Sequence, residues 1–123
     1  MKRELPSVLS SGMEEQPCSV VALCNALDDL KIEQPFDVKT DRYDYATIKD
    51  MNTAIRSVLT VRYTWCKKSF RETLEKKFQS GIFRGKKAIV LVQNHFIYVN
   101  NDTYYSFFDN AKDEVIAFWF IKE

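Results

Sequence analysis

The sequence contains few of the residues that form loops and cross-links. Of its 123 residues, only three are glycine and three are proline, so we expect regular helices and strands with short connections. There are also only three cysteines, which cannot all pair within the chain, and their spacing does not match a disulfide framework. These shortages favour a reduced protein, and we predict a cytoplasmic location.

Long apolar runs and a strong net charge are also missing. No segment approaches the roughly eighteen apolar residues of a membrane-spanning helix, and the amino-terminal run MKRELPSVLSSG lacks the apolar core of a secretory signal. The formal net charge of +1 gives no reason to expect nucleic acid or an anionic membrane as a partner. With 46% hydrophobic and 28% charged residues, the chain has the composition of one globular domain over residues 1–123.

The two halves of the chain have different periodicities. Apolar residues recur at helical spacing in the amino-terminal part, which predicts helices over 17–30, 44–59 and 69–81. After Gly81 the segments become rich in β-branched and aromatic residues separated by Asn and Asp, which predicts strands at 88–93, 95–100, 103–108 and 114–121. A further short strand is expected at 60–66. We therefore predict an α+β fold in which amino-terminal helices pack on a carboxy-terminal antiparallel β-sheet.

The stretch EEQPCSVVALCNAL, residues 14–27, places a proline and a cysteine where the first helix should begin. Pro17 suits the first helical position, because the N–H it lacks would be unpaired there. The unpaired N–H groups and partial positive charge of the first turn favour Cys18 as a thiolate, the nucleophilic form. Cys18 also lies nearly opposite the apolar side of this helix, whereas Cys24 lies nearer that side and is expected in the core. Cys18 is thus a candidate nucleophile; the alternative is that it is another small buried residue.

A nucleophilic thiol needs a base, and His95 is the only histidine. It opens the predicted strand HFIYVN at 95–100. If the following hairpin has a three-residue loop, His95 faces Asp109 across the strand pair; a two-residue loop moves Asp109 one position away. A carboxylate beside the imidazole would hold one ring nitrogen and leave the other for the thiol. Cys18, His95 and Asp109 therefore predict a catalytic triad, although a lone histidine on a strand is often structural.

These motifs resemble a known family. PCSVVAL is similar to the nucleophile helix of papain-like cysteine peptidases, in particular the leader-peptide peptidases of bacteriocin exporters. NHFIYV resembles their histidine strand, and FFDNA resembles the strand that carries their aspartate. The resemblance runs through the whole chain in order. It implies a papain-like fold and peptide-bond hydrolysis by a thiol nucleophile at Cys18, a base at His95 and an orienting carboxylate at Asp109.

The chain departs from the family pattern next to the nucleophile. The resemblance implies a Gln six residues before the cysteine, which would donate its amide to the oxyanion, but Gly12 occupies that position. Gln16, two residues before the cysteine, is the candidate oxyanion donor in its place. Ser19 stands where the family usually has Gly. Losing one oxyanion donor typically costs roughly 10²–10³ in rate, so this departure favours a slow or silent relative.

Several functions therefore stay open. The leading interpretation is a cysteine peptidase, a thiol protease that hydrolyses a peptide or isopeptide bond in a peptide or protein substrate without a cofactor. The alternatives are a catalytically silent papain-like module that binds a peptide or host protein, and a structural protein. Zinc is not expected, because the candidate ligands Cys18, Cys24, Cys66 and His95 include no C-x-x-C pair. The sequence does not indicate the oligomeric state.

Overall fold

The computed structural model describes residues 1–6, 18–33, 47–93 and 95–122. The expectations for Gly12, Gln16 and Pro17 lie outside these residues. The helices are α1 (Cys18–Asp29), α2 (Ile48–Val58) and α3 (Leu74–Gln79), and the strands are β1 (Lys2–Glu4), β2 (Val61–Trp65), β3 (Lys87–Val92), β4 (His95–Asn100), β5 (Thr103–Tyr105) and β6 (Val115–Ile121). None of the described helices is long and apolar enough to cross a membrane.

The strands form one six-stranded sheet in the order β1-β5-β4-β3-β6-β2. Every neighbouring pair is antiparallel except β1 and β5, which run parallel. The α+β prediction is confirmed, whereas the expectation of a purely antiparallel sheet is wrong. The short polar run Lys2–Glu4 carries no strand periodicity, so its pairing with β5 could not be recognised in the sequence.

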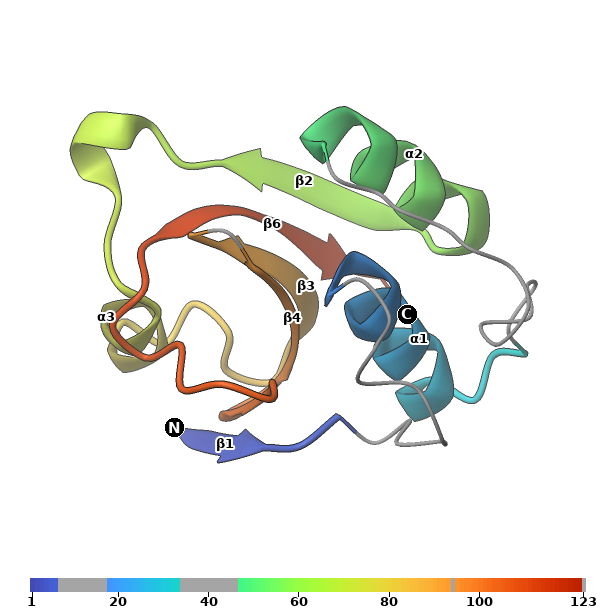
Figure 1. Cartoon of the computed structure of the whole chain (residues 1–123), viewed down its shortest axis with the longest axis horizontal. Coiled ribbons are helices and arrows are strands. Elements are labelled where there is room, and N and C mark those ends of the chain that lie inside the picture. Colours follow the sequence, from blue (N-terminus) through green and yellow to red (C-terminus); the bar gives the residue numbers. More distant parts are fainter. Residues whose placement is uncertain (7–17, 34–46, 94, 123) are drawn as a thin grey trace.

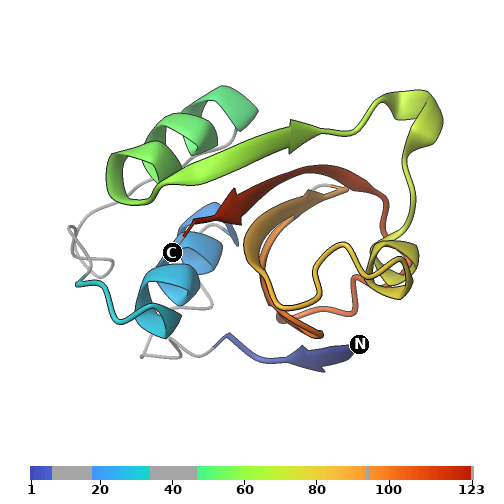
Figure 2. The ribbon, with the colours of Figure 1, turned by 180° about the vertical axis from the view of Figure 1, so that it is seen from behind.

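Helices cover both faces of the sheet (Figures 1 and 2). α1 and α2 pack on one face, around buried residues that include Leu23, Leu27, Ile55 and Trp119. α3 lies on the other face, inside the concave side of the curved sheet, over a second cluster that includes Leu74, Phe83 and Phe118. The prediction that helices pack on a sheet is therefore correct, but the sheet is a middle layer.

The third predicted helix begins later than expected. Ser69 lies in a short 3-10 turn, Lys68–Phe70, and α3 starts at Leu74. The cap is Thr73, whose hydroxyl accepts a hydrogen bond from Lys76 N. Both Ser69 and Thr73 are followed by residues that suit the first turn of a helix. Ser69 lies inside the 3-10 turn, so Thr73 is the residue that caps α3.

Helix α1 is attached to the sheet along β4. At its carboxyl end, the Asp29 carboxylate accepts hydrogen bonds from Tyr98 Oη at 2.6 Å and Asn100 Nδ2 at 2.9 Å. At its amino end, the Cys18 sulfur accepts one from Phe96 N at 3.5 Å. Helix and strand therefore run in the same direction. A helix rises about 1.5 Å and a strand about 3.3 Å per residue, so α1 and β4 both span about 17 Å and their first residues meet.

Candidate active site

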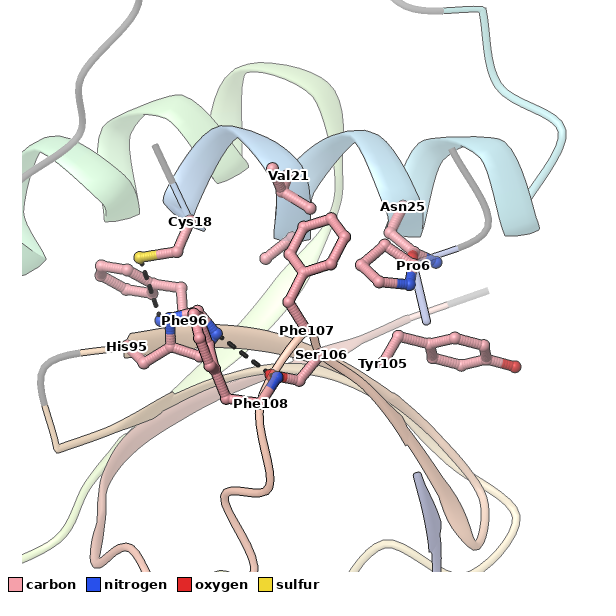
Figure 3. A pocket seen from close by; sticks show the side chains of 11 residues that line it. Pro6, Cys18, Val21, Asn25, His95, Phe96, Tyr105, Ser106, Phe107 and Phe108 are labelled. Carbon is pink, nitrogen blue, oxygen red and sulfur yellow. Dashed lines mark hydrogen bonds between the residues drawn. The ribbon is translucent and has the colours of Figure 1, made fainter. Parts of the chain in front are cut away.

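Cys18 is the first residue of α1 and His95 is the first residue of β4. The matched lengths of these two elements bring the residues together although they are far apart in the chain. Figure 3 shows the Cys18 sulfur pointing away from α1 toward the start of β4, where His95 and Phe96 lie. Cys18 is partly exposed, so the thiol is accessible from the adjoining cavity.

A cavity of about 360 Å³ lies between α1 and the sheet, beside the thiol. Its walls come from α1, β4, the end of β5 and the residues after it, and Pro6 near the amino terminus: Pro6, Cys18, Val21, Ala22, Asn25, His95, Phe96, Tyr105, Ser106, Phe107 and Phe108. Most of these side chains are apolar or aromatic, with a few polar groups among them. Such a lining suits a peptide segment or another ligand with apolar groups.

The ring of His95 is held on two sides. Its Nε2 atom lies 3.2 Å from Ser106 Oγ, and its ring packs edge to face against Phe108 at 5.6 Å between centroids. Burial lowers the pKa of His95 below its ordinary value, and the negative charge of Asp113 opposes this shift. The imidazole is therefore neutral at neutral pH, as a general base must be before it accepts a proton.

Within the described part of the chain, Nδ1 of His95 makes no hydrogen bond, and the Cys18 sulfur accepts one from Phe96 N but none from the imidazole. A backbone N–H that donates to the sulfur interacts more strongly with the thiolate than with the thiol. Catalytic hydrogen bonds are often absent or long without substrate and form only in the complex. The two side chains share one cavity, and the ring nitrogen not held by Ser106 is the one left for the thiol.

Asp109 is not where the sequence predicted it. The hairpin has the two-residue loop, with Asn100 paired to Thr103, and β5 ends at Tyr105. The Oδ1 atom of Asp109 accepts hydrogen bonds from Tyr104 Oη at 3.1 Å and from Ala111 N at 3.0 Å. These two donors, the backbone N–H foremost, lower the pKa of the Asp109 carboxyl. Asp109 does not line the cavity, and the hydrogen bond of the His95 ring goes to Ser106 instead.

Ser106 lies next to the His95 ring instead, and its hydroxyl begins a chain of hydrogen bonds to two further residues, Asn110 and Asp113. Its hydroxyl donates to Asn110 Oδ1 at 2.6 Å, and Asn110 Nδ2 donates to Asp113 Oδ2 at 2.8 Å. Ser106 and Asn110 are only 2% and 5% exposed. Sequence reasoning missed both. For Ser106 the available signal was a serine between the aromatic pairs of YYSFF, since a buried serine must find partners.

The other two cysteines lie away from this site. Cys24 is fully buried on α1, and burial raises its pKa to about 12. Cys66 belongs to the cluster on the opposite face of the sheet, and burial raises its pKa as well. Across the described residues, no group of three or more His, Cys, Asp or Glu side chains is placed to hold a metal ion.

Comparisons with known proteins return no match. No protein-family model matches the chain, and no curated protein or solved structure matches it.

Proposed function

We propose that this chain is a papain-like cysteine peptidase that uses Cys18 as nucleophile and His95 as base. The observation that carries the proposal is that the only histidine of the chain shares one cavity with a partly exposed cysteine at the first position of a helix. The carboxylate of Asp109 is not part of this proposal. Its place beside the imidazole is taken by Ser106.

The chemistry uses His95 first as proton acceptor and then as proton donor in each of two stages, acylation and deacylation. The imidazole accepts the thiol proton as the Cys18 sulfur attacks the carbonyl carbon, which forms a C–S bond. The C–N bond then breaks, and the imidazolium returns the proton to the leaving amine, which leaves a thioester. Water attacks this thioester while the imidazole accepts one of its protons. The C–S bond then breaks, the imidazolium returns its proton to the sulfur, and the carboxylic acid leaves.

The start of α1 provides the environment in which this attack is favourable. The first N–H groups of a helix have no partner within it and carry partial positive charge. They stabilise the thiolate before the attack and the oxyanion after it. The apolar cavity beside the thiol favours a substrate with apolar side chains near the bond that is cleaved. Because all three cysteines are free thiols, a reducing compartment such as the cytoplasm suits the enzyme.

A second candidate is a silent module of the same fold that binds a peptide in the cavity without cleaving it. The observation that favours it is the engagement of Asp109 by Tyr104 and Ala111: among the described residues, the hydrogen bond of the imidazole goes to the hydroxyl of Ser106 and not to a carboxylate. Both candidates require the cavity, but only the peptidase requires the thiol to become acylated.

The decisive experiment is to trap the acyl-enzyme. The parent chain is mixed with a library of peptides and ubiquitin-like proteins, quenched in acid, and measured by intact mass spectrometry. We expect a mass increase equal to the acyl part of a substrate, located on the peptide that contains Cys18, together with released amine product. Cys18→Ala should abolish both signals, and Cys66→Ala, on the other face of the sheet, is the matched control that should keep them. Binding without adduct or product would establish the silent module.

A further inference from the structure

The hydrogen bonds that start at His95 form a chain of three side chains: Ser106, Asn110 and Asp113. These residues lie after β5, and Figure 3 shows the first link, from the His95 ring to Ser106. The segment is held in place from several sides. Ser106 N donates to Glu4 O at 2.9 Å, and Asn110 N donates to Tyr104 Oη at 3.3 Å. The two middle members, Ser106 and Asn110, are buried, and an anchored chain of polar groups has few alternative arrangements, so its protons can be assigned from one end to the other.

The assignment begins at Asp113, because an ionised carboxylate only accepts hydrogen bonds. Its partner on Asn110 must therefore be the amide NH₂, at 2.8 Å. This orients the amide so that its oxygen faces Ser106 Oγ at 2.6 Å. That oxygen also only accepts, so the one hydroxyl hydrogen of Ser106 must point to it. With that hydrogen elsewhere, two acceptor oxygens would face each other at 2.6 Å.

The same reasoning continues to the imidazole. Once Ser106 has given its hydrogen to Asn110, its oxygen has only lone pairs left. One accepts from Phe108 N at 3.1 Å, and the other faces His95 Nε2 at 3.2 Å. Nε2 must therefore carry the ring proton, and Nδ1 keeps the lone pair of the neutral imidazole.

We propose that Ser106, Asn110 and Asp113 act as a relay of positioning residues that holds His95 in its Nε2–H tautomer, with Nδ1 as the base for Cys18. The relay takes the role that the sequence assigned to Asp109, and it does so through two buried neutral side chains. It rests on the proposed function, because the base is needed only if Cys18 is a nucleophile. The relay also serves both states of the ring, since Nε2 stays protonated when Nδ1 accepts the thiol proton.

The test is direct because the chain has a single histidine. Uniformly ¹⁵N-labelled parent protein, kept reduced at about pH 8 so that the ring is neutral, gives one pair of ring nitrogen signals in a long-range ¹H–¹⁵N correlation. We expect a protonated-type shift for Nε2 and an unprotonated-type shift for Nδ1. The reverse assignment, or the averaged shifts of two exchanging tautomers, overturns the proposal. This measurement needs neither a variant nor a substrate.

Variants then test whether the effect travels along the relay. Ser106→Ala should move both ¹⁵N shifts toward the averaged values of a free imidazole. Losing one net hydrogen bond changes the ratio of the two tautomers by roughly 2- to 12-fold. Asn110→Ala should shift them in the same direction although Ser106 is intact. Ser57→Ala is the matched control, since its hydroxyl donates to Ala54 O within α2, and it should leave both shifts unchanged. Parent-like shifts in Asn110→Ala would overturn the relay.

The results also separate the relay from the proposed function. If the parent ring is the Nε2–H tautomer but no substrate acylates Cys18, the relay stands and the peptidase proposal fails. If Cys18 is acylated while the ring exchanges between tautomers, the peptidase proposal stands and the relay fails.

Discussion

The three cysteines should react with iodoacetamide at very different rates in the native protein. Cys18 lines the cavity and is partly exposed. Cys24 is 0% exposed, and burial raises its pKa from 9.0 to about 12. Because only the thiolate reacts, this rise of three pKa units lowers the reactive fraction of Cys24 about 1,000-fold at neutral pH. Its burial also keeps the reagent away from the sulfur until the structure opens.

Cys66 provides a second comparison on the other face of the sheet. It is 9% exposed, and burial raises its pKa, partly offset by the charges of Lys77 and Arg71. We therefore expect the order Cys18, then Cys66, then Cys24. A time course at about pH 7.5, digested and measured by mass spectrometry, gives the three rates. Cys18 should react faster than Cys24 by well over about tenfold, because the Cys24 thiol is both buried and held in its protonated form.

The control for this prediction is the unfolded chain. In concentrated urea the three thiols lose their different surroundings, and their rates should agree within a factor of a few. Cys18→Ser should remove the fast phase of the native protein and leave the two slow sites unchanged. Native rates for Cys18 and Cys24 within tenfold of each other would refute the reasoning. In that case Cys18 is a packed thiol and not a nucleophile.

Three further predictions concern the base, the displaced carboxylate and the core. Burial lowers the pKa of folded His95, so the unfolded chain binds a proton first, and the parent should lose stability as the pH falls below about 6.5. Urea midpoints between about pH 5 and 7 should show this slope, and a parallel curve for His95→Gln would contradict it. Asp109→Asn should leave the ¹⁵N shifts of the His95 ring unchanged, because its carboxylate bonds to Tyr104; shifts like those of Ser106→Ala would restore the predicted triad. Leu27→Ala, at a fully buried position under α1, should lower the free energy of unfolding by about 2–5 kcal/mol in urea, and a loss below about 1 kcal/mol would be inconsistent with the packing of this helix.

Much of the fold was readable because the periodic segments are long. The predicted strand at 95–100 matches β4, and the predicted helix at 17–30 contains α1. In both segments the apolar spacing runs through the whole element, so burial on one face decides the secondary structure. β1 has only three residues, all polar. Its position depends on the backbone of β5, and no property of its own side chains indicates it.

Two residues of the candidate site, Cys18 and His95, could be named from the sequence for a similar reason. Cys18 and His95 are the first residues of two regular elements, and each was identified by residue type and position. That they share a cavity follows from the direction and length of α1 relative to β4. The approximate lengths follow from the predicted elements, but the relative direction of helix and strand is not visible in the sequence, where the two residues are far apart.

The third group of the site could not be predicted from a strand register. Placing Asp109 beside His95 assumed that β5 continues to residue 108, but the strand ends at Tyr105. At that point Ser106 N turns to Glu4 O on β1, the strand that the sequence did not reveal. The chain leaves the ladder there, so Ser106 reaches the imidazole and Asp109 does not. The error about the carboxylate and the missed strand therefore concern the same short element: β5, which pairs with β4 on one side and with β1 on the other, ends four residues before Asp109.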